Sequence, residues 1–216
     1  MFSQTIKPIF RINKRQKRRK QFKTSPPIKA YQFIPHLVRS FVCSVIVETE
    51  KEYTVGGGCL TTIGLLTAAH NLEGNIKNIY ADFCINEFVG FTVQLREAIC
   101  FKNLDLAVFE APQLTFPGFK PAKVVIDDIN LIKKIISENP IFSFGCPQGI
   151  FGLTWEATPV YLDNQCLYTI GFGWFGVSGG PVFAVIDNEP IVLAINSELA
   201  FPTMTLLSRL INLKAS

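Results

Sequence analysis

Twelve short apolar runs, separated by turn residues, are the feature that most restricts the fold of this 216-residue chain. The runs are rich in Val, Ile, Phe and Tyr, and Gly, Asn, Asp or Pro separates them. Short strands at this spacing are typical of an all-β sandwich or barrel. Six runs precede a Pro-containing link at 112–121 and six follow it, which predicts two six-stranded antiparallel β-barrels over 41–117 and 118–216. The runs are 41–48, 53–60, 64–68, 77–84, 88–96 and 106–110, then 122–126, 140–145, 156–162, 166–170, 181–186 and 191–197.

Two segments instead fit helices. Asp127 and Asp128 can cap a helix over 129–138, in which three isoleucines share one face. The segment 204–213 (MTLLSRLINL) has leucines at helical spacing, so we expect a C-terminal helix there.

Charge is divided unevenly along the chain. Residues 1–47 hold eleven Lys and Arg and no Asp or Glu, whereas the remainder holds ten basic and all 17 acidic side chains. Seven of the ten residues 11–20 are basic, so we expect 1–40 to be a disordered basic arm and linker. Residues 11–23 could bind RNA or another polyanion. The dense run 14–20 within them also fits a nuclear import signal or part of a mitochondrial transit peptide, and the alternative to all three is a solvated tail with no specific partner. No signal peptide is evident, which favours an intracellular location in the cytoplasm or nucleus.

Composition excludes several other classes of protein. With 48% hydrophobic residues and 19 Phe, the chain cannot be disordered throughout. None of the six cysteines forms a CxxC pair, which argues against a zinc-ribbon or thioredoxin-type site, and we expect no metal and no cofactor. Because no export signal is evident, we expect the thiols to be reduced. The uncharged stretch 164–186 holds five Gly and one Pro, which a lone helix in lipid does not tolerate, so we expect no membrane span.

Two segments carry residues suited to chemistry. His70, one of only two histidines with His36, ends the apolar run GGGCLTTIGLLTAAH. Ser178 lies in GWFGVSGGPVF at 173–183, whose glycines allow a tight turn with backbone N–H groups converging on one point. A nucleophilic Ser needs a base for its proton and donors for an oxyanion. The same segment matches GxGxxG, but a strand rather than a helix follows it, which excludes a dinucleotide site.

Chain order separates the known folds of serine hydrolases. An α/β-hydrolase has its His after the Ser, and no His follows Ser178. A subtilisin-type enzyme has its Asp before the His, and the first Asp is Asp82, after His70. The order His, Asp, Ser remains, and it belongs to the chymotrypsin fold of two six-stranded β-barrels.

The acid of such a triad must be buried and paired. Asp105 lies between Leu104 and Leu106 at the start of an apolar run, where a charge is costly unless it has a partner. We therefore predict Asp105 as the acid, and Asp82 as the second choice.

Three blocks resemble the catalytic blocks of trypsin-like serine peptidases. They are TAAH at 67–70, LDLAVF at 104–109 and GVSGGP at 176–181, and the resemblance covers roughly 41–213 in block order. Within that superfamily, the high-temperature-requirement (Deg-type) branch and compact viral enzymes are the most similar. The resemblance implies a chymotrypsin-like fold and a peptide-cleaving active site.

The resemblance also implies a role for individual residues. His70 is the general base and later the general acid, Asp105 fixes its tautomer, and Ser178 is the nucleophile. The backbone N–H groups of Gly176 and Ser178 form the oxyanion hole. The substrate-pairing residues are Ile195, Asn196 and Ser197, on a strand that pairs with the substrate backbone.

Three positions depart from the secreted digestive enzymes. Asn71 stands where those enzymes have a Cys after the catalytic His, and Val177 stands where they have an Asp before the Ser. Val177 cannot pair with a newly freed N-terminus, so activation by that switch is not expected. Phe172 takes the place of an acid at the base of the specificity pocket, so cleavage after Lys or Arg is not expected either.

The sequence thus predicts a serine endopeptidase that hydrolyses a protein or peptide substrate through a His-Asp-Ser triad and an acyl-enzyme. The alternative is a protease-fold protein that binds RNA or another polyanion through its arm, with weak or lost catalysis.

Overall fold

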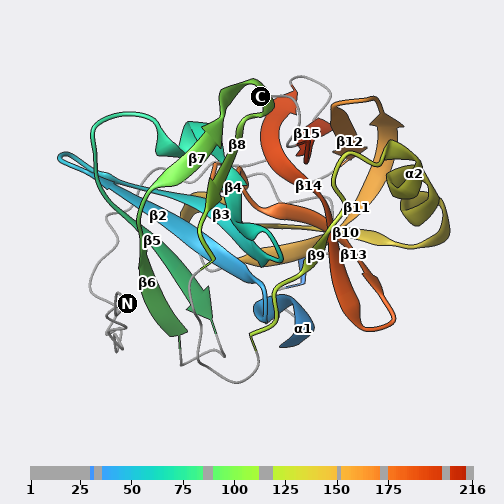
Figure 1. Ribbon diagram of the computed structural model, residues 1–216, viewed down its shortest axis with the longest axis horizontal. Coiled ribbons are helices and arrows are strands. Elements are labelled where there is room, and N and C mark those ends of the chain that lie inside the picture. Colours follow the sequence, from blue (N-terminus) through green and yellow to red (C-terminus); the bar gives the residue numbers. More distant parts are fainter. Residues whose placement is uncertain are drawn as a thin grey trace.

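Two mainly antiparallel sheets lie side by side in the computed structural model (Figure 1). The structure describes residues 30–31, 36–84, 90–111, 119–149, 152–170, 175–200 and 205–212. The basic segment 11–23 lies outside the described residues, and its predicted role stays a prediction. The predicted disorder over 1–40 is wrong at 30–31 and 36–39, where the structure has a short strand that pairs with the second sheet and a short helix.

The first sheet has seven strands in the order β6-β5-β2-β3-β4-β8-β7. They are β2 (Val42–Thr49), β3 (Tyr53–Thr61), β4 (Gly64–Ala68), β5 (Ile76–Cys84), β6 (Gly90–Leu95), β7 (Ala98–Phe101) and β8 (Leu106–Phe109). Among the described residues its edge strands β6 and β7 do not pair with each other, so the sheet is an open half-barrel. The predicted closed six-stranded barrel is therefore wrong for this half. The prediction missed β7, a four-residue strand that pairs with β8 and exposes its two central side chains.

The second sheet closes into a six-stranded barrel as predicted, although the predicted strand at 122–126 lies outside the ring and residues 205–210 complete it instead. Strands β10 to β15 form the ring β11-β10-β13-β14-β15-β12, which β12 closes by pairing with β11. The short strands β1 and β9 add to this ring from outside it, on β11 and β14. The strands are β1 (Ala30–Tyr31), β9 (Lys123–Val124), β10 (Ile141–Gly145), β11 (Leu153–Leu162), β12 (Cys166–Ile170), β13 (Pro181–Ile186), β14 (Glu189–Ala200) and β15 (Thr205–Leu210).

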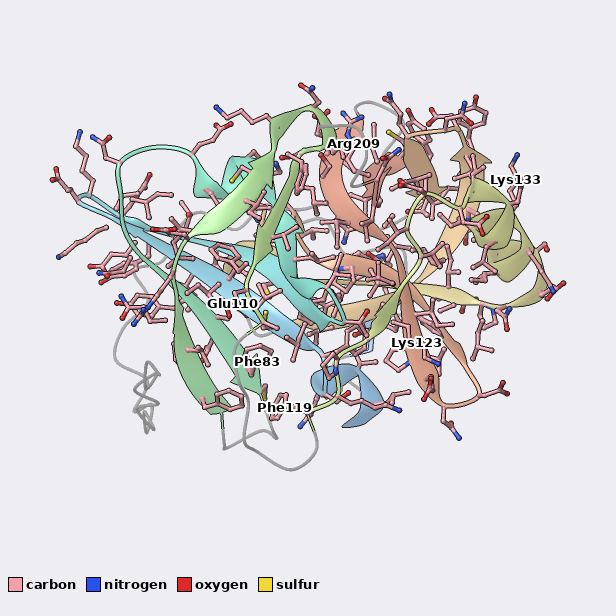
Figure 2. The ribbon with its side chains drawn as sticks, in the orientation of Figure 1. Phe83, Glu110, Phe119, Lys123, Lys133 and Arg209 are labelled. Atoms are coloured by element: carbon pink, nitrogen blue, oxygen red, sulfur yellow. The ribbon has the colours of Figure 1, made fainter. Side chains whose placement is uncertain are left out.

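The predicted C-terminal helix is wrong, because β15 occupies its place. The leucines of this segment fit a helical face, but Leu206, Ser208 and Leu210 also alternate, and it is these three that are buried. β15 hydrogen-bonds to both β14 and β12 and so completes the barrel. Tertiary pairing outweighs local helical spacing here. Arg209, on the opposite face of β15, donates to the sulfur of Cys166 at 3.2 Å (Figure 2).

The predicted helix at 129–138 is confirmed as α2 (Ile129–Glu138). The side chain of Asp128 accepts a hydrogen bond from the Leu131 N–H at 2.9 Å and caps the helix. Ile132 and Ile135 are buried against the second sheet. The other helices are α1 (His36–Arg39) and the 3-10 helices η1 (Ala69–Leu72), η2 (Lys102–Leu104) and η3 (Pro147–Gly149). No helix in the described ranges has the length and hydropathy needed to cross a membrane.

Apolar clusters fill each sheet and join the two sheets to each other. One fills the first sheet, where the rings of Phe83 and Phe119 meet edge to face at 5.5 Å (Figure 2). A second fills the barrel of the other sheet. The third joins the two, with Phe41 from the first half packed edge to face on Phe183 of β13 at 5.2 Å. This shared core fixes the position of one sheet against the other, and the candidate site lies where they meet.

Candidate active site

His70 lies on a 3-10 helix that follows a buried strand. β4 ends at Ala68, and η1 begins at Ala69. The Ala69 N–H donates to the carbonyl oxygen of Asp105 at 3.0 Å. The start of η1 is therefore tied to the segment that carries Asp105, and the imidazole lies half-buried at the end of the sheet.

Both carboxylate oxygens of Asp105 accept hydrogen bonds from His70, one from the imidazole ring and one from the backbone. Oδ2 lies 2.7 Å from Nδ1 of His70, and Oδ1 accepts the His70 backbone N–H at 2.9 Å. Asp105 has a φ of 48°, in the left-handed region that Asp tolerates better than most residues. Because Nδ1 donates its proton to the carboxylate, Nε2 is left as the basic nitrogen of the ring.

The two groups shift each other's pKa in opposite directions. The hydrogen bond that His70 donates to Asp105 raises the pKa of His70, burial opposes this, and the charges of Asp105, Glu73 and Glu198 add to the rise. Burial alone would raise the pKa of Asp105, but hydrogen bonds from His70 and Ser197 outweigh it and hold that pKa below its ordinary value. His70 is therefore a stronger base than an isolated imidazole, and the Asp105 carboxyl beside it favours the ionised form.

Ser178 lies on a turn that only glycines can form. Gly176 has a φ of 94° and Gly179 a φ of 88°. A Cβ atom at Gly176 would lie 2.1 Å from the carbonyl oxygen of Cys146, so no other residue fits there. The Gly179 N–H donates to the carbonyl oxygen of Asn196 at 2.8 Å, which holds the turn against β14.

Ser197 connects the serine turn to the carboxylate. The hydroxyl of Ser178 donates to the carbonyl oxygen of Ser197 at 3.2 Å, and the Ser197 hydroxyl donates to Oδ2 of Asp105 at 2.5 Å. Sequence reasoning placed Ser197 beside the substrate and missed its bond to Asp105. No pattern in the sequence indicates that bond, because the two residues lie 92 positions apart.

The other two residues expected to pair with substrate are built into the barrel. Asn196 is fully buried, its side chain binds Ser143 and Ser208, and its backbone N–H and C=O are bonded to Gly180 and Gly179. Ile195 is also buried, at a register position between β13 and β15. Of the three, Ser197 is the one whose atoms meet the candidate site.

Among the described residues, the expected oxyanion donors have no hydrogen-bond acceptor. Within the described residues, no hydrogen bond uses the backbone N–H of Gly176 or of Ser178, whereas the N–H groups of Gly179 and Gly180 are both bonded. Two unused N–H groups beside a serine hydroxyl are suited to hold a developing negative charge.

The remaining candidates lie elsewhere or outside the described residues. Asp82, the second-choice acid, is on β5, where it accepts a hydrogen bond from the Thr92 hydroxyl at 2.9 Å. Phe172 lies outside the described residues, so its place in a specificity pocket stays a prediction. In the described ranges, no cluster of three or more His, Cys, Asp and Glu side chains could hold a metal ion, and the six cysteines are free thiols.

Comparison with known proteins reveals similarity in structure only. No family model and no curated protein matches the sequence. The Rv3671c protease from M. tuberculosis, in its active form, is 16% identical with a TM-score of 0.59, over 90% of this chain and 89% of that one. HL collagenase is 13% identical with a TM-score of 0.66, over 85% and 93%. A serine protease of human pathogenic astrovirus is 19% identical with a TM-score of 0.51, over 80% and 90%.

All three similar structures are trypsin- or chymotrypsin-fold serine proteases. The chain has the chymotrypsin fold. At identities this low, the similarity establishes the fold and leaves the activity to the residues of the site. His70 and Asp105 lie next to strands of the first sheet, and Ser178 lies next to β13 of the second.

Removing the carboxylates near His70 is expected to lower its pKa. Glu73 and Glu198 raise the pKa of His70, so Glu73→Gln and Glu198→Gln should each make the imidazole easier to deprotonate. A base must be neutral to act, so any reaction that needs neutral His70 should extend to lower pH in these variants. NMR titration of the imidazole measures the shift directly. Glu50→Gln, on the distant β2–β3 hairpin, is the matched control, and an unshifted His70 titration in both variants would contradict the prediction.

Proposed function

We propose that this protein is a serine endopeptidase that cleaves a protein or peptide substrate through an acyl-enzyme. The observation that carries the proposal is the His70–Asp105 pair, with its Nε2 left as the base, beside a serine on a glycine turn. The fold of known serine proteases supports it, and so do the two unused N–H groups of that turn.

In the proposed first half-reaction, the Ser178 hydroxyl leaves the Ser197 carbonyl and turns to Nε2 of His70. The hydrogen bond between a catalytic serine and its histidine is often long in the absence of substrate and shortens in the substrate complex. His70 takes the proton as Oγ bonds to the substrate carbonyl carbon. The oxyanion is held by the N–H groups of Gly176 and Ser178. His70 then gives its proton to the amine that leaves as the C–N bond breaks.

In the second half-reaction, a water molecule attacks the acyl ester and gives its proton to His70. The bond to Oγ breaks, Ser178 takes the proton back, and the carboxylic acid product leaves. Asp105 stays ionised throughout and stabilises the imidazolium formed in each half, which agrees with its lowered pKa.

The end of β14 is suited to bind the substrate backbone. Beyond Asn196, β14 pairs with β15 on one side, whereas its pairing with β13 ends at Ile195. Within the described residues this leaves one edge of the last residues of β14 without a strand, beginning where the Ser197 carbonyl meets Ser178. An extended peptide can add to such an edge by main-chain hydrogen bonds. We further propose that the enzyme prefers apolar or small side chains at the cleaved position, because Phe172 stands in the sequence where an acid would select Lys or Arg.

A fluorophosphonate probe tests the proposal, because it reacts only with an activated serine. We expect the intact wild-type protein to be labelled at Ser178, and Ser178→Ala to remain unlabelled. Ser137→Ala, on the exposed surface of α2, is the control and should be labelled like the wild type. No labelling between about pH 6 and 9 would reject the enzyme and favour the alternative, a protease-fold protein that binds polyanions through 11–23.

A further inference from the structure

The carbonyl oxygen of Ser178 receives two hydrogen bonds from the first sheet. The backbone N–H of Gly57, on β3, donates to it at 2.8 Å. Nδ2 of Asn71, on η1, donates to it at 3.1 Å. Both bonds cross from the first sheet, which carries His70, to the turn that carries the serine.

The peptide group between Ser178 and Gly179 is thereby held at both ends. Its C=O is bonded to the first sheet, and its N–H donates to the Asn196 carbonyl of the second at 2.8 Å. A peptide group is planar, so bonds at both ends fix its orientation. That orientation sets the backbone torsion of Ser178 and so the direction of its side chain.

Only the NH₂ end of the Asn71 amide fits this position. Nδ2 has two hydrogens, and it donates to the hydroxyl oxygen of Thr67 at 3.2 Å as well as to Ser178. The Thr67 hydroxyl gives its own proton to the Gly57 carbonyl at 2.8 Å, so it can only accept from Asn71. An oxygen in place of Nδ2 would face two acceptors and be repelled.

Neighbouring glycines leave room for this amide. A Cβ atom at Gly56 would lie 2.3 Å from Nδ2 of Asn71, and one at Gly179 would lie 2.7 Å from it. The same Cβ at Gly179 would lie 2.2 Å from the Thr67 hydroxyl. Glycine therefore occupies the positions on both sides of the Asn71 amide, where a side chain would displace it.

We propose that Asn71 is a positioning residue that sets the separation between the His70 imidazole and the Ser178 hydroxyl. Asn71 directly follows His70 in η1, so one short helix carries the base and also binds the backbone of the nucleophile. The inference rests on the proposed peptidase function. A misplacement of about 1 Å between reacting groups can cost about 100-fold in rate.

Two variants of Asn71 test the proposal. Asn71→Ala removes the amide, and Asn71→Asp keeps its shape but replaces the donor by an acceptor. We expect kcat and the rate of fluorophosphonate labelling to fall about 10- to 100-fold in each, with KM changed little, because the reacting groups and not the substrate edge are displaced. In Asn71→Ala, the pH midpoint of labelling should stay that of the wild type, since His70 keeps Asp105. Asn139→Ala, which removes another amide bonded to a main-chain carbonyl, is the matched control.

Gly56→Ala gives an independent test. Its new Cβ should push the amide off the Ser178 carbonyl and reproduce the loss of labelling rate. Asn71→Ala removes Nδ2 and Cγ, which this Cβ would meet at 2.3 and 2.9 Å, but leaves the Ser178 carbonyl oxygen, which it would meet at 2.9 Å. The double variant should therefore lose less than the product of the single losses, because only the two contacts with Asn71 are shared. If the loss of labelling rate in the double variant equals the product of the two single losses, Gly56→Ala does not act through the Asn71 amide, and the proposal is contradicted.

The outcomes separate this inference from the proposed function. A reactive wild type, with folded Asn71→Ala and Asn71→Asp labelled within about twofold of its rate, overturns the inference alone. If Asn71→Ala does not fold, the isosteric Asn71→Asp decides. A rise in KM with unchanged kcat would also overturn it, because that pattern belongs to substrate binding. An unreactive wild type overturns both proposals.

Discussion

Replacement of Ser178 or His70 by alanine is expected to remove nearly all peptide hydrolysis, about 10⁴- to 10⁶-fold in kcat. The serine forms the covalent bond and the imidazole moves its proton, so neither contributes much without the other. For this reason the double variant, with both Ser178 and His70 replaced by alanine, should be about as active as either single variant. Steady-state hydrolysis of a peptide selected from a library measures all three.

Two controls accompany this prediction. His36→Ala removes the only other histidine and should leave turnover unchanged. The thermal midpoints of the Ser178 and His70 variants should stay close to the wild type, because both side chains are partly exposed. Turnover within tenfold of the wild type in folded Ser178→Ala would mean that another group is the nucleophile.

Asp105→Asn is expected to lower kcat by about 10⁴-fold although it changes the size of the side chain very little. An amide nitrogen facing Nδ1 of His70 would favour the tautomer that carries its proton on Nε2, which cannot accept the proton of Ser178. The variant should also lower the pKa of His70, since the hydrogen bond that His70 donates to the Asp105 carboxylate is the main cause of its rise. Peptide hydrolysis and NMR titration of His70 measure the two effects separately.

Asp82→Asn is the matched control for this variant. Asp82 was the second-choice acid in the sequence, and its carboxylate bonds to Thr92 on the neighbouring strand. We expect Asp82→Asn to hydrolyse peptides at nearly the wild-type rate. Near-normal turnover in Asp105→Asn, together with its loss in Asp82→Asn, would transfer the role of the acid to Asp82.

Local patterns in the sequence were sufficient for most of the strands. Alternating apolar runs between turn residues predicted the strands from β2 to β6 and from β10 to β14, because burial of one face leaves that pattern in the chain itself. The same reasoning failed at β15, where helical spacing and strand alternation coexist in one segment. Only the pairing of β15 with β12 and β14 decides between them.

The sequence by itself determined which residues are candidates for chemistry. The blocks around His70, Asp105 and Ser178 are short and contiguous, and their order along the chain excluded the other serine-hydrolase folds. Tertiary structure alone decided how these residues are connected. The bonds of Ser197 to Asp105 and of Asn71 to Ser178 join positions 92 and 107 residues apart. Such contacts depend on how two sheets pack across a shared core, and a pattern confined to neighbouring residues does not encode that packing.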